Sequence, residues 1–337
     1  MLYDTAVYIG RFQPVHNAHV EIMQRALAQA SHLIIVLGSA YQPRTYKNPF
    51  HAYDRELMIK ASLSEAGVDS YRYTILYLKD NRYDNQAWAK SVQELLQPFV
   101  GTGKIALIGH KKDESSFYLD MFPQWGFIDV PLIEPLAATD IRELLFKTVP
   151  NLNFIKSVVP KSVLEFLGEF IHTQEFRDIC AEREFVLKYQ AQFASLPYKP
   201  VFVTVDAVVI QSAHVLMVRR RSYPGKGLLA LPGGFLDADS DSSVQSAAIR
   251  ELKEETGIKV PEKVLIGSIV ANKVFDAKDR STRGRTITHA FKFDLGAGAL
   301  PKVRGGDDAE KALWVPLAKL NSSECYEDHY DIIKALH

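Results

Sequence analysis

The sequence predicts an α/β protein with a doubly wound parallel sheet in its first domain and a second domain after it. The length of 337 residues is generous for one domain, and 47% apolar residues are enough for two cores. Strand and helix patterns alternate from the start of the chain, which favours a parallel sheet with helices on both faces. A helical pattern over 160–193 then meets Pro197 and Pro200, which end helices and favour extended chain.

The composition excludes several classes of protein. Basic and acidic residues balance to a formal net charge of +0, which gives no field that would attract nucleic acid or an anionic membrane. No apolar run is long enough for a membrane span, and no basic segment precedes the first strand as a signal peptide would require. Cys180 and Cys325 are far apart and lack metal-ligand spacing, which fits a reducing compartment. We therefore expect a cytoplasmic protein.

The first strand and the turn after it carry the strongest functional signal. An apolar run over 7–9 suits a buried strand, Gly10 interrupts it, and apolar residues recur at helical spacing over 18–30. His16 and His19 lie three residues apart at the mouth of this helix and so face the same way. The free N–H groups and positive dipole end of a helix mouth suit phosphate. The alternative is that one histidine caps the helix and the other packs.

The remaining elements of the first domain alternate in the same way. Strands are expected over 33–37, 73–78 and 105–108, and helices over 52–66 and 87–96. In a parallel sheet the carboxyl ends of the strands meet at one edge, where ligands bind. Polar candidates follow each strand in turn: Gly38, Ser39 and Arg44, then Asp80, Asn81 and Asn85, then Gly109, His110 and Asp113.

The turn also carries a family resemblance. Residues 10–19 read G-R-F-Q-P-V-H-N-A-H and resemble the signature G-R-F-Q-P-x-H-x-G-H of nucleotidyltransferases, specifically the nicotinamide mononucleotide (NMN) adenylyltransferases of archaeal type. Ala18 departs from the family's usual glycine and adds a methyl group at the turn. Residues 80–88 look like the nicotinamide pocket of that family, in which the Trp88 indole would stack on a pyridinium ring. The alternative is that Trp88 is a core aromatic residue.

Residues 136–142 read L-A-A-T-D-I-R and resemble the I-S-S-T-x-I-R motif of the same superfamily. Alanines stand where that motif has two serines, whereas Thr139 and Arg142 are retained. We expect Thr139 to cap the next helix and Arg142 to reach a phosphate with two donors. The alternative is a simple capped surface helix.

The resemblance implies adenylyl transfer. A phosphate oxygen of NMN would attack the α-phosphorus of ATP, with Mg²⁺ on the phosphates and no general base. It assigns catalysis to His16, His19 and Arg142. The ATP- and NMN-binding residues it implies are Gly10, Arg11, Phe12, Asp80, Asn85, Trp88, Gly109, Asp113 and Thr139. The expected domain limits are 1–183 for the adenylyltransferase, 184–198 for a linker and 199–337 for the second domain.

The second domain contains a helix with carboxylates on one side. Glu251, Glu254 and Glu255 are three and four residues apart, so they repel one another unless a cation joins them. Hard oxygen ligands suit Mg²⁺, with Mn²⁺ as the alternative ion. The competing interpretation is a solvated acidic helix.

This helix resembles a known motif. Residues 231–234, L-P-G-G, precede R-E-L-K-E-E-T-G-I at 250–258, which is the core of the Nudix box G-x5-E-x7-R-E-U-x-E-E-x-G-U. The spacing from Gly234 to Arg250 is two residues too long, and Ser242 stands where the first Glu belongs. Asp237, Asp239 and Asp241 are candidate substitutes. The resemblance implies an α/β/α-sandwich Nudix domain whose metal ligands are Gly234, Glu251, Glu254 and Glu255, the last two also being catalytic.

A basic loop follows in the second domain. Residues 274–289 resemble the loop of Nudix enzymes that act on ADP-ribose, and Arg280, Arg283 and Arg285 are the implied contacts to a diphosphate or ribose. The alternative is a solvated hairpin tip. Glu310, or Asp308 beside it, would help to activate water. Together the resemblances cover nearly the whole chain and imply the bifunctional family of NMN adenylyltransferase/ADP-ribose pyrophosphatases.

Two other functions remain open. The second domain could sense a ligand without hydrolysing it. The altered first half of the box supports this function, and the intact Arg250, Glu251, Glu254 and Glu255 oppose it. The first domain could serve another phosphate acceptor such as phosphopantetheine, although residues 80–88 favour nicotinamide. The expected partners are ATP, NMN and ADP-ribose, without nucleic acid or membrane, and a homo-oligomer is compatible with the sequence.

Overall fold

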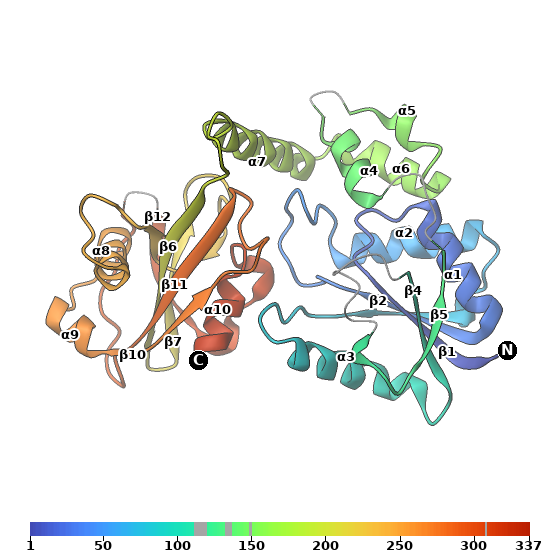
Figure 1. Ribbon diagram of the computed structural model, residues 1–337, viewed down its shortest axis with the longest axis horizontal. Coiled ribbons are helices and arrows are strands. Elements are labelled where there is room, and N and C mark those ends of the chain that lie inside the picture. Colours follow the sequence, from blue (N-terminus) through green and yellow to red (C-terminus); the bar gives the residue numbers. More distant parts are fainter. Residues whose placement is uncertain (111–119, 132–136, 148–149, 307–308) are drawn as a thin grey trace. The chain divides into compact units, whose positions relative to one another are not determined.

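The computed structural model describes residues 1–110, 120–131, 137–147, 150–306 and 309–337. The chain divides into two compact units, Met1–Cys180 and Ala181–His337 (Figure 1). Each unit has its own sheet and is described by itself. Within the described residues, no helix combines the length and apolar character needed to cross a bilayer.

The first unit is built on a parallel sheet in the order β3-β2-β1-β4-β5. Its strands are β1 (Tyr3–Gly10), β2 (Ala30–Leu37), β3 (Tyr73–Tyr77), β4 (Ile105–Gly109) and β5 (Gly126–Asp129). The central strand β1 pairs on both sides, with Val7 opposite Ile34 of β2 and Leu107 of β4. This order confirms the predicted doubly wound sheet, while β5 was not predicted.

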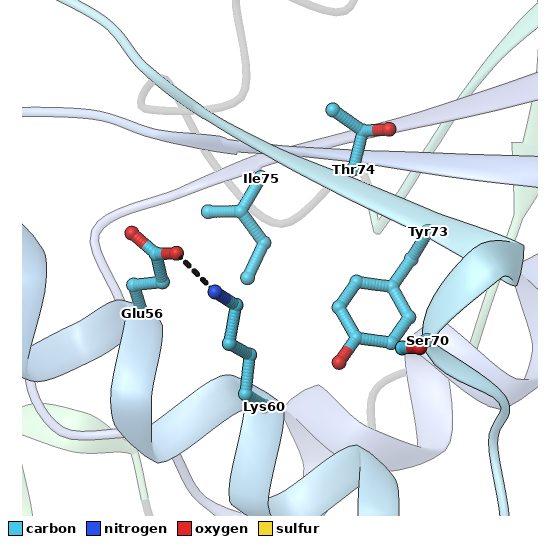
Figure 2. Close-up of a pocket in the computed structure, with 6 residues that line it drawn as sticks. All are labelled: Glu56, Lys60, Ser70, Tyr73, Thr74 and Ile75. Carbon is cyan, nitrogen blue, oxygen red and sulfur yellow. Dashed lines mark ion pairs between the residues drawn. The ribbon is translucent and has the colours of Figure 1, made fainter.

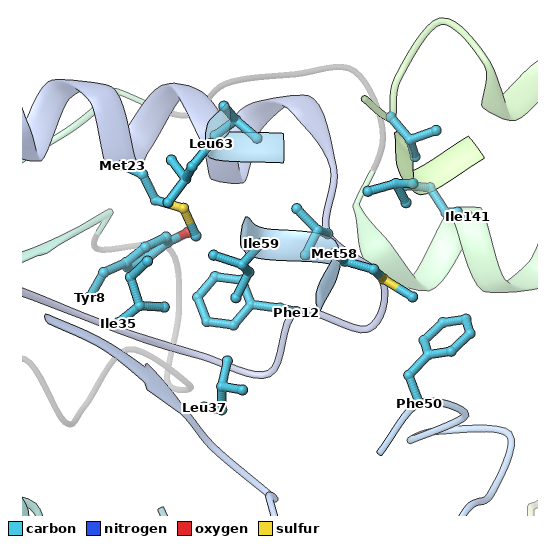
Figure 3. Packing of buried hydrophobic residues seen from close by; sticks show 14 of the residues in the cluster. Tyr8, Phe12, Met23, Ile35, Leu37, Phe50, Met58, Ile59, Leu63 and Ile141 are labelled. Carbon is cyan, nitrogen blue, oxygen red and sulfur yellow. The ribbon is translucent and has the colours of Figure 1, made fainter. Parts of the chain in front are cut away.

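Helices cover both faces of this sheet (Figure 1). They are α1 (Asn17–Gln29), α2 (Ala52–Glu65), α3 (Asn85–Val100), α4 (Ala138–Leu145), α5 (Leu152–Ile155) and α6 (Lys161–Phe170), with a 3₁₀ turn η1 (Ser70–Arg72). Alternate residues of β1 point to opposite faces. Ala6 and Tyr8 join the core formed with α1, α2 and α6, part of which is drawn in Figure 3. Val7 and Ile9 join the core formed with α3.

The second unit is built on a mixed sheet in the order β10-β11-β6-β7-β12, with β8 added to β7 and β9 to β6. Its strands are β6 (Val201–Gln211), β7 (His214–Arg220), β8 (Leu229–Ala230), β9 (Gly233–Phe235), β10 (Ile269–Phe275), β11 (Arg285–Asp294) and β12 (Ala309–Pro316). Strand β11 runs parallel to β6, and the other pairs are antiparallel.

Two helices lie on opposite faces of the mixed sheet (Figure 1). Val205, Ala207 and Val209 of β6 pack in one core with α8 (Val244–Thr256). Asp206 on the other face of β6 lies near α10 (His329–Leu336). The remaining helical elements are α9 (Glu262–Gly267) and the 3₁₀ turns η3 (Leu317–Lys319) and η4 (Ser322–Glu324).

Helix α7 (Gln174–Ala191) runs through the point where the chain divides. Phe176 and Ile179 belong to the core of the first unit. Further along, Glu182 accepts a hydrogen bond from the Gly225 N–H in the second unit. The predicted limits of 1–183, 184–198 and 199–337 remain a prediction.

Candidate active sites

The turn between β1 and α1 is held by buried contacts. Phe12 adopts the left-handed backbone conformation, with φ of 51°. Its ring covers Gly10 so closely that a Cβ there would lie 2.8 Å from the ring carbon Cζ. The Gln13 side chain donates to the Phe50 carbonyl at 2.9 Å and accepts from the Phe50 N–H at 3.0 Å. The turn therefore has one backbone conformation fixed from several directions.

His16 and His19 stack on each other at the start of α1. Their ring centroids are 3.6 Å apart, and the His16 backbone N–H donates to His19 Nδ1 at 3.2 Å. Because Nδ1 accepts, neutral His19 carries its proton on Nε2 and offers that N–H as a donor. Burial lowers the pKa of His16 to about 4, and burial together with His16 lowers the pKa of His19 well below its usual value. His16 also occupies the N-cap position, so the capping role and a ligand-binding role are compatible.

Arg142 reaches the same turn from α4. Its Nη1 donates to the Gln13 carbonyl at 2.7 Å and its Nη2 donates to Thr139 Oγ1 at 3.1 Å. Its Nε is buried without a hydrogen-bond partner. Burial lowers the pKa of Arg142 to about 10, which leaves the guanidinium charged at neutral pH.

The expectation that Thr139 caps α4 is wrong. Ala137 is the N-cap residue, and the Asp140 carboxylate accepts from its backbone N–H at 2.9 Å. Asp140, three residues after the cap, supplies the carboxylate that bonds back to the cap N–H. The Thr139 hydroxyl is thereby left to accept from Arg142.

The other predicted residues of the first unit lie at the carboxyl edge of the sheet. Asp80, beyond β3, accepts from the Ser39 N–H at 3.0 Å, while Gly109 ends β4. Asn85 is the first residue of α3, and Trp88, one turn later, lies with its ring centroid 6.2 Å from that of Phe122. Trp88 is partly buried in the core on that face, so both interpretations of its role remain. Asp113 lies outside the described residues.

The second site forms where β9 meets the acidic side of α8. The Gly233 N–H donates to Glu255 Oε2 at 3.0 Å. A Cβ on Gly234 would lie 2.4 Å from Glu251 Oε1, so the backbone approaches this carboxylate closely and a larger residue would displace the Glu251 side chain. Burial raises the pKa of Glu251, whereas Glu254 has 53% of its side chain exposed.

Arg250 holds the carboxylates of this helix together. Its Nη1 donates to Glu251 at 2.8 Å and to Glu254 at 2.9 Å, while its other side faces Asp241. The carboxylates thus converge on the guanidinium, and no three acidic, His or Cys side chains of the described residues are grouped as a ready metal site. Of the three candidate substitutes for the missing glutamate, Asp241 is the one that contacts Arg250.

The structure separates the three arginines of the basic loop. Arg280 is buried and forms two bonds of 3.0 Å with the Asp328 carboxylate, so its guanidinium lies in the interior rather than facing a ligand. The Arg283 guanidinium lies 4.8 Å from the centroid of the Phe235 ring, and its Nε has no hydrogen-bond partner. Arg285 donates to the Asp276 carbonyl. The side chain of Glu310, and Asp308, lie outside the described part of the chain.

The sequence did not single out a polar cluster beside this site. Asp206 of β6 accepts from the Thr288 hydroxyl at 2.6 Å and faces His329 Nε2 at 3.9 Å. His329 Nδ1 accepts from the Leu231 N–H at 2.8 Å, at the start of the turn that leads to Gly233. The sequence did offer one signal for this cluster, since Asp206 lies within the apolar run of β6 and a buried carboxylate requires partners.

A surface cavity of 630 Å³ lies elsewhere, between α2 and β3. Figure 2 shows Lys60 pointing toward Glu56, with which it forms an ion pair of 2.6 Å. The cavity contains none of the predicted site residues. Its lining consists of Glu56, Lys60, Ser70, Tyr73, Thr74 and Ile75.

Comparisons with known proteins give a family for each unit. Residues 7–144 match the cytidylyltransferase-like family, and residues 200–336 match the NUDIX domain. A nicotinamide/nicotinic acid mononucleotide adenylyltransferase from Acinetobacter baylyi is 37% identical over 57% of this chain and 97% of its own length. An ADP-ribose pyrophosphatase from Methanocaldococcus jannaschii is 36% identical over 39% of this chain and 70% of its own.

One solved structure matches along almost the whole chain. It is a bifunctional NMN adenylyltransferase/ADP ribose pyrophosphatase from Francisella tularensis, 37% identical, with a TM-score of 0.90 over 99% of this chain and 98% of that one. A second crystal structure of that type from the same organism is complexed with AMP and a manganese ion.

Proposed function

This chain belongs to the family of bifunctional NMN adenylyltransferase/ADP-ribose pyrophosphatases, and on that premise we propose that it carries out both reactions of the family. The first unit would transfer the adenylyl group of ATP to NMN and release NAD and pyrophosphate. The second would hydrolyse ADP-ribose to AMP and ribose 5-phosphate. The observation that supports this most strongly is the stacked His16–His19 pair beside Arg142 at one turn, together with Gly234 against Glu251 in the other unit.

In the first unit, the chemistry requires alignment of two anions rather than a base. The attacking phosphate oxygen of NMN is already a nucleophile, so the protein must hold it in line with the α-phosphorus and offset the growing charge. His19, with Nδ1 accepting from the backbone, would donate its Nε2 proton to a phosphate oxygen. The unpartnered Nε of Arg142 supports a charge-assisted contact to the same phosphates.

The rest of the first site would recognise the substrates. Gly10, Arg11 and Phe12 line the turn on which the nucleotide would lie, with Thr139 orienting Arg142. We assign NMN to the loop after β3 and the start of α3, where Trp88 would stack on the nicotinamide ring. The remaining assignments in this site are Asp80, Asn85, Gly109 and Asp113.

In the second unit the residues present fit a divalent cation. Carboxylates of Glu251, Glu254 and Glu255 and the backbone at Gly234 offer hard oxygen donors, and Gly234 lies directly against the Glu251 carboxylate. When bound, such an ion lowers the pKa of water and offsets the charge of a diphosphate. We propose Mg²⁺ in this place, with Mn²⁺ as the alternative.

Recognition of ADP-ribose would fall to the basic loop. Arg283 and Arg285 are partly exposed and charged, which suits a diphosphate or a terminal ribose. Arg280 is left out of the ligand contacts because Asp328 already takes two of its donors. We also propose that Glu310 helps to activate water. The cytoplasmic location and the domain limits are proposals as well.

The alternative of a sensor that does not hydrolyse is not favoured. Arg250 and the three glutamates are all present, and Asp241 contacts Arg250 where the box lacks its first glutamate. Two incubations test the proposal: ATP with NMN, followed by the formation of NAD, and ADP-ribose with Mg²⁺, followed by the formation of AMP. Failure of either reaction in a folded preparation would contradict the activity that we propose for the corresponding unit.

A further inference from the structure

We propose that Arg55 is a positioning residue of the first site, which fixes the phosphate-binding turn from the interior without touching the substrate. The inference rests on the proposed adenylyltransferase function. Arg55 lies in the first turn of α2, and its side chain has 0% exposure.

The guanidinium of Arg55 ties two loops together. Its Nη1 donates to the Arg11 carbonyl at 2.6 Å and to the Gly38 carbonyl at 2.8 Å, and its Nη2 donates to the Ser39 carbonyl at 3.1 Å. Arg11 belongs to the turn after β1, whereas Gly38 and Ser39 follow β2. A rigid planar fork of donors suits such a task, because each N–H has a fixed direction.

These carbonyls adjoin the two strained positions of the site. Phe12, directly after Arg11, has φ of 51°, and Ser39 has φ of 49°. Residues other than glycine adopt this left-handed backbone conformation at an energetic cost, and they keep it only where surrounding contacts enforce it. The bonds from Arg55 to Arg11 and Ser39 are contacts of that kind. They hold Phe12 over Gly10 and the turn in the shape that presents His16.

The hydrogen bonds that connect these loops extend to a third loop. The Ser39 N–H donates to Asp80 Oδ1 at 3.0 Å, and the Gly38 N–H donates to the Gly10 carbonyl at 2.9 Å. The loops after β1, β2 and β3 are thus one bonded unit with Arg55 at its centre. A loosened Arg55 would displace residues assigned to ATP and to NMN at the same time.

Arg55 also adds positive charge beneath the site. Its hydrogen-bond partners are the carbonyl oxygens of His51, Arg11, Gly38 and Ser39. Burial lowers its pKa to about 10, so it remains protonated at neutral pH and every N–H stays a donor. The charges of Asp80 and Asp54 partly offset this lowering of the pKa.

The test compares Arg55→Lys with Arg72→Lys. Arg72 is a matched control, because it also donates to backbone carbonyls, those of Ser31, Leu27 and Ala30, but at the amino end of β2. Both variants should lose thermal stability. Arg55→Lys should also lower kcat for NAD synthesis by about tenfold to a hundredfold, with a smaller rise in KM, since misalignment costs rate more than affinity. Arg72→Lys should keep kcat close to the parent value.

Several results would overturn the proposal. If Arg55→Lys loses stability but retains the parental kcat, Arg55 has only a structural role. If Arg55→Lys and Arg55→Gln both fail to fold while Arg72→Lys folds, Arg55 is a requirement of the fold and not a positioning residue. A parent protein that makes no NAD would instead contradict the proposed function. ADP-ribose hydrolysis, measured on the same preparations, should be unchanged in both lysine variants.

Discussion

Asp241 and Arg250 form a bidentate ion pair at the head of the acidic helix. Arg250 Nε donates to Asp241 Oδ1 at 2.9 Å, and Arg250 Nη2 donates to Asp241 Oδ2 at 2.7 Å. The Asp241 side chain has 3% exposure, and the bonds from Arg250 lower its pKa. The two extra residues before α8 therefore do not leave Arg250 unsupported, because a shorter carboxylate reaches it from a different position in the loop.

We expect Asp241→Asn to reduce ADP-ribose hydrolysis. The substitution removes the charge that orients Arg250, which in turn holds Glu251 and Glu254, and the loss of such an outer partner typically costs about 10- to 100-fold in activity or metal affinity. Steady-state hydrolysis at increasing Mg²⁺ measures this. Asp237→Asn is the control, since Asp237 accepts from the Asp239 and Ser240 backbone N–H groups of its own turn and Asp241 is the aspartate that contacts Arg250. Equal activity in both variants would remove Asp241 from the site.

Two of the three arginines of the basic loop, Arg280 and Arg283, should behave differently. Arg283→Ala should raise KM for ADP-ribose by roughly tenfold, the value of one charge-assisted hydrogen bond. Arg280→Ala should instead destabilise the protein by about 3 kcal/mol or more, because it removes one side of a buried ion pair with Asp328. Denaturant unfolding and hydrolysis kinetics separate the effects. An Arg280→Ala variant with parental stability and a raised KM would instead show that Arg280 contacts ADP-ribose.

The histidine pair should make folding stability depend on pH. The unfolded chain protonates His16 near pH 6.5, whereas the folded chain does so only near pH 4. The contribution of this group is therefore complete above pH 6.5 and is lost as the pH falls towards 4, by about 2 kcal/mol at pH 5. His16→Asn keeps a good N-cap residue that does not titrate. Urea unfolding at pH 7 and pH 5 should show a smaller loss in this variant, and equal losses would contradict the buried neutral state.

Trp88 should contribute to binding of NMN and not of ATP. Trp88→Leu removes the aromatic face, and a lost cation–π contact of about 1 kcal/mol weakens NMN several-fold. Trp88→Phe keeps a ring and should lose less. Calorimetric titration of each substrate measures both affinities, after circular dichroism has verified the fold, because Trp88 also packs near Phe122. An unchanged affinity of Trp88→Leu for NMN would make Trp88 a core residue.

The sequence predicted those parts that depend on local patterns. The apolar runs of β1 and β2 and the helical spacing of α8 are strong signals over many residues, and the fold followed from them. Strand β5 was not predicted because its four residues, Gly126 to Asp129, are too few to show the alternation of apolar and polar residues that marks a strand. The capping role predicted for Thr139 was wrong because the helix begins earlier, with the Asp140 carboxylate bonded to the N–H of the N-cap residue Ala137. Both side chains can cap a helix, and only the three-dimensional structure shows which one does. Arg280 could not be recognised as an interior residue because Asp328, its partner, is far along the chain.

We propose that two independent active sites share one chain. Measuring NAD synthesis and ADP-ribose hydrolysis on the same preparations of Glu255→Gln and His19→Ala decides whether the sites are independent. Gln keeps an oxygen that can accept from the Gly233 N–H but removes the anionic ligand, so hydrolysis should fall while NAD synthesis stays near the parent value. His19→Ala should lower NAD synthesis about tenfold or more through a lost phosphate donor and leave hydrolysis intact. If both activities fell together in either folded variant, the account of two separate sites would be contradicted.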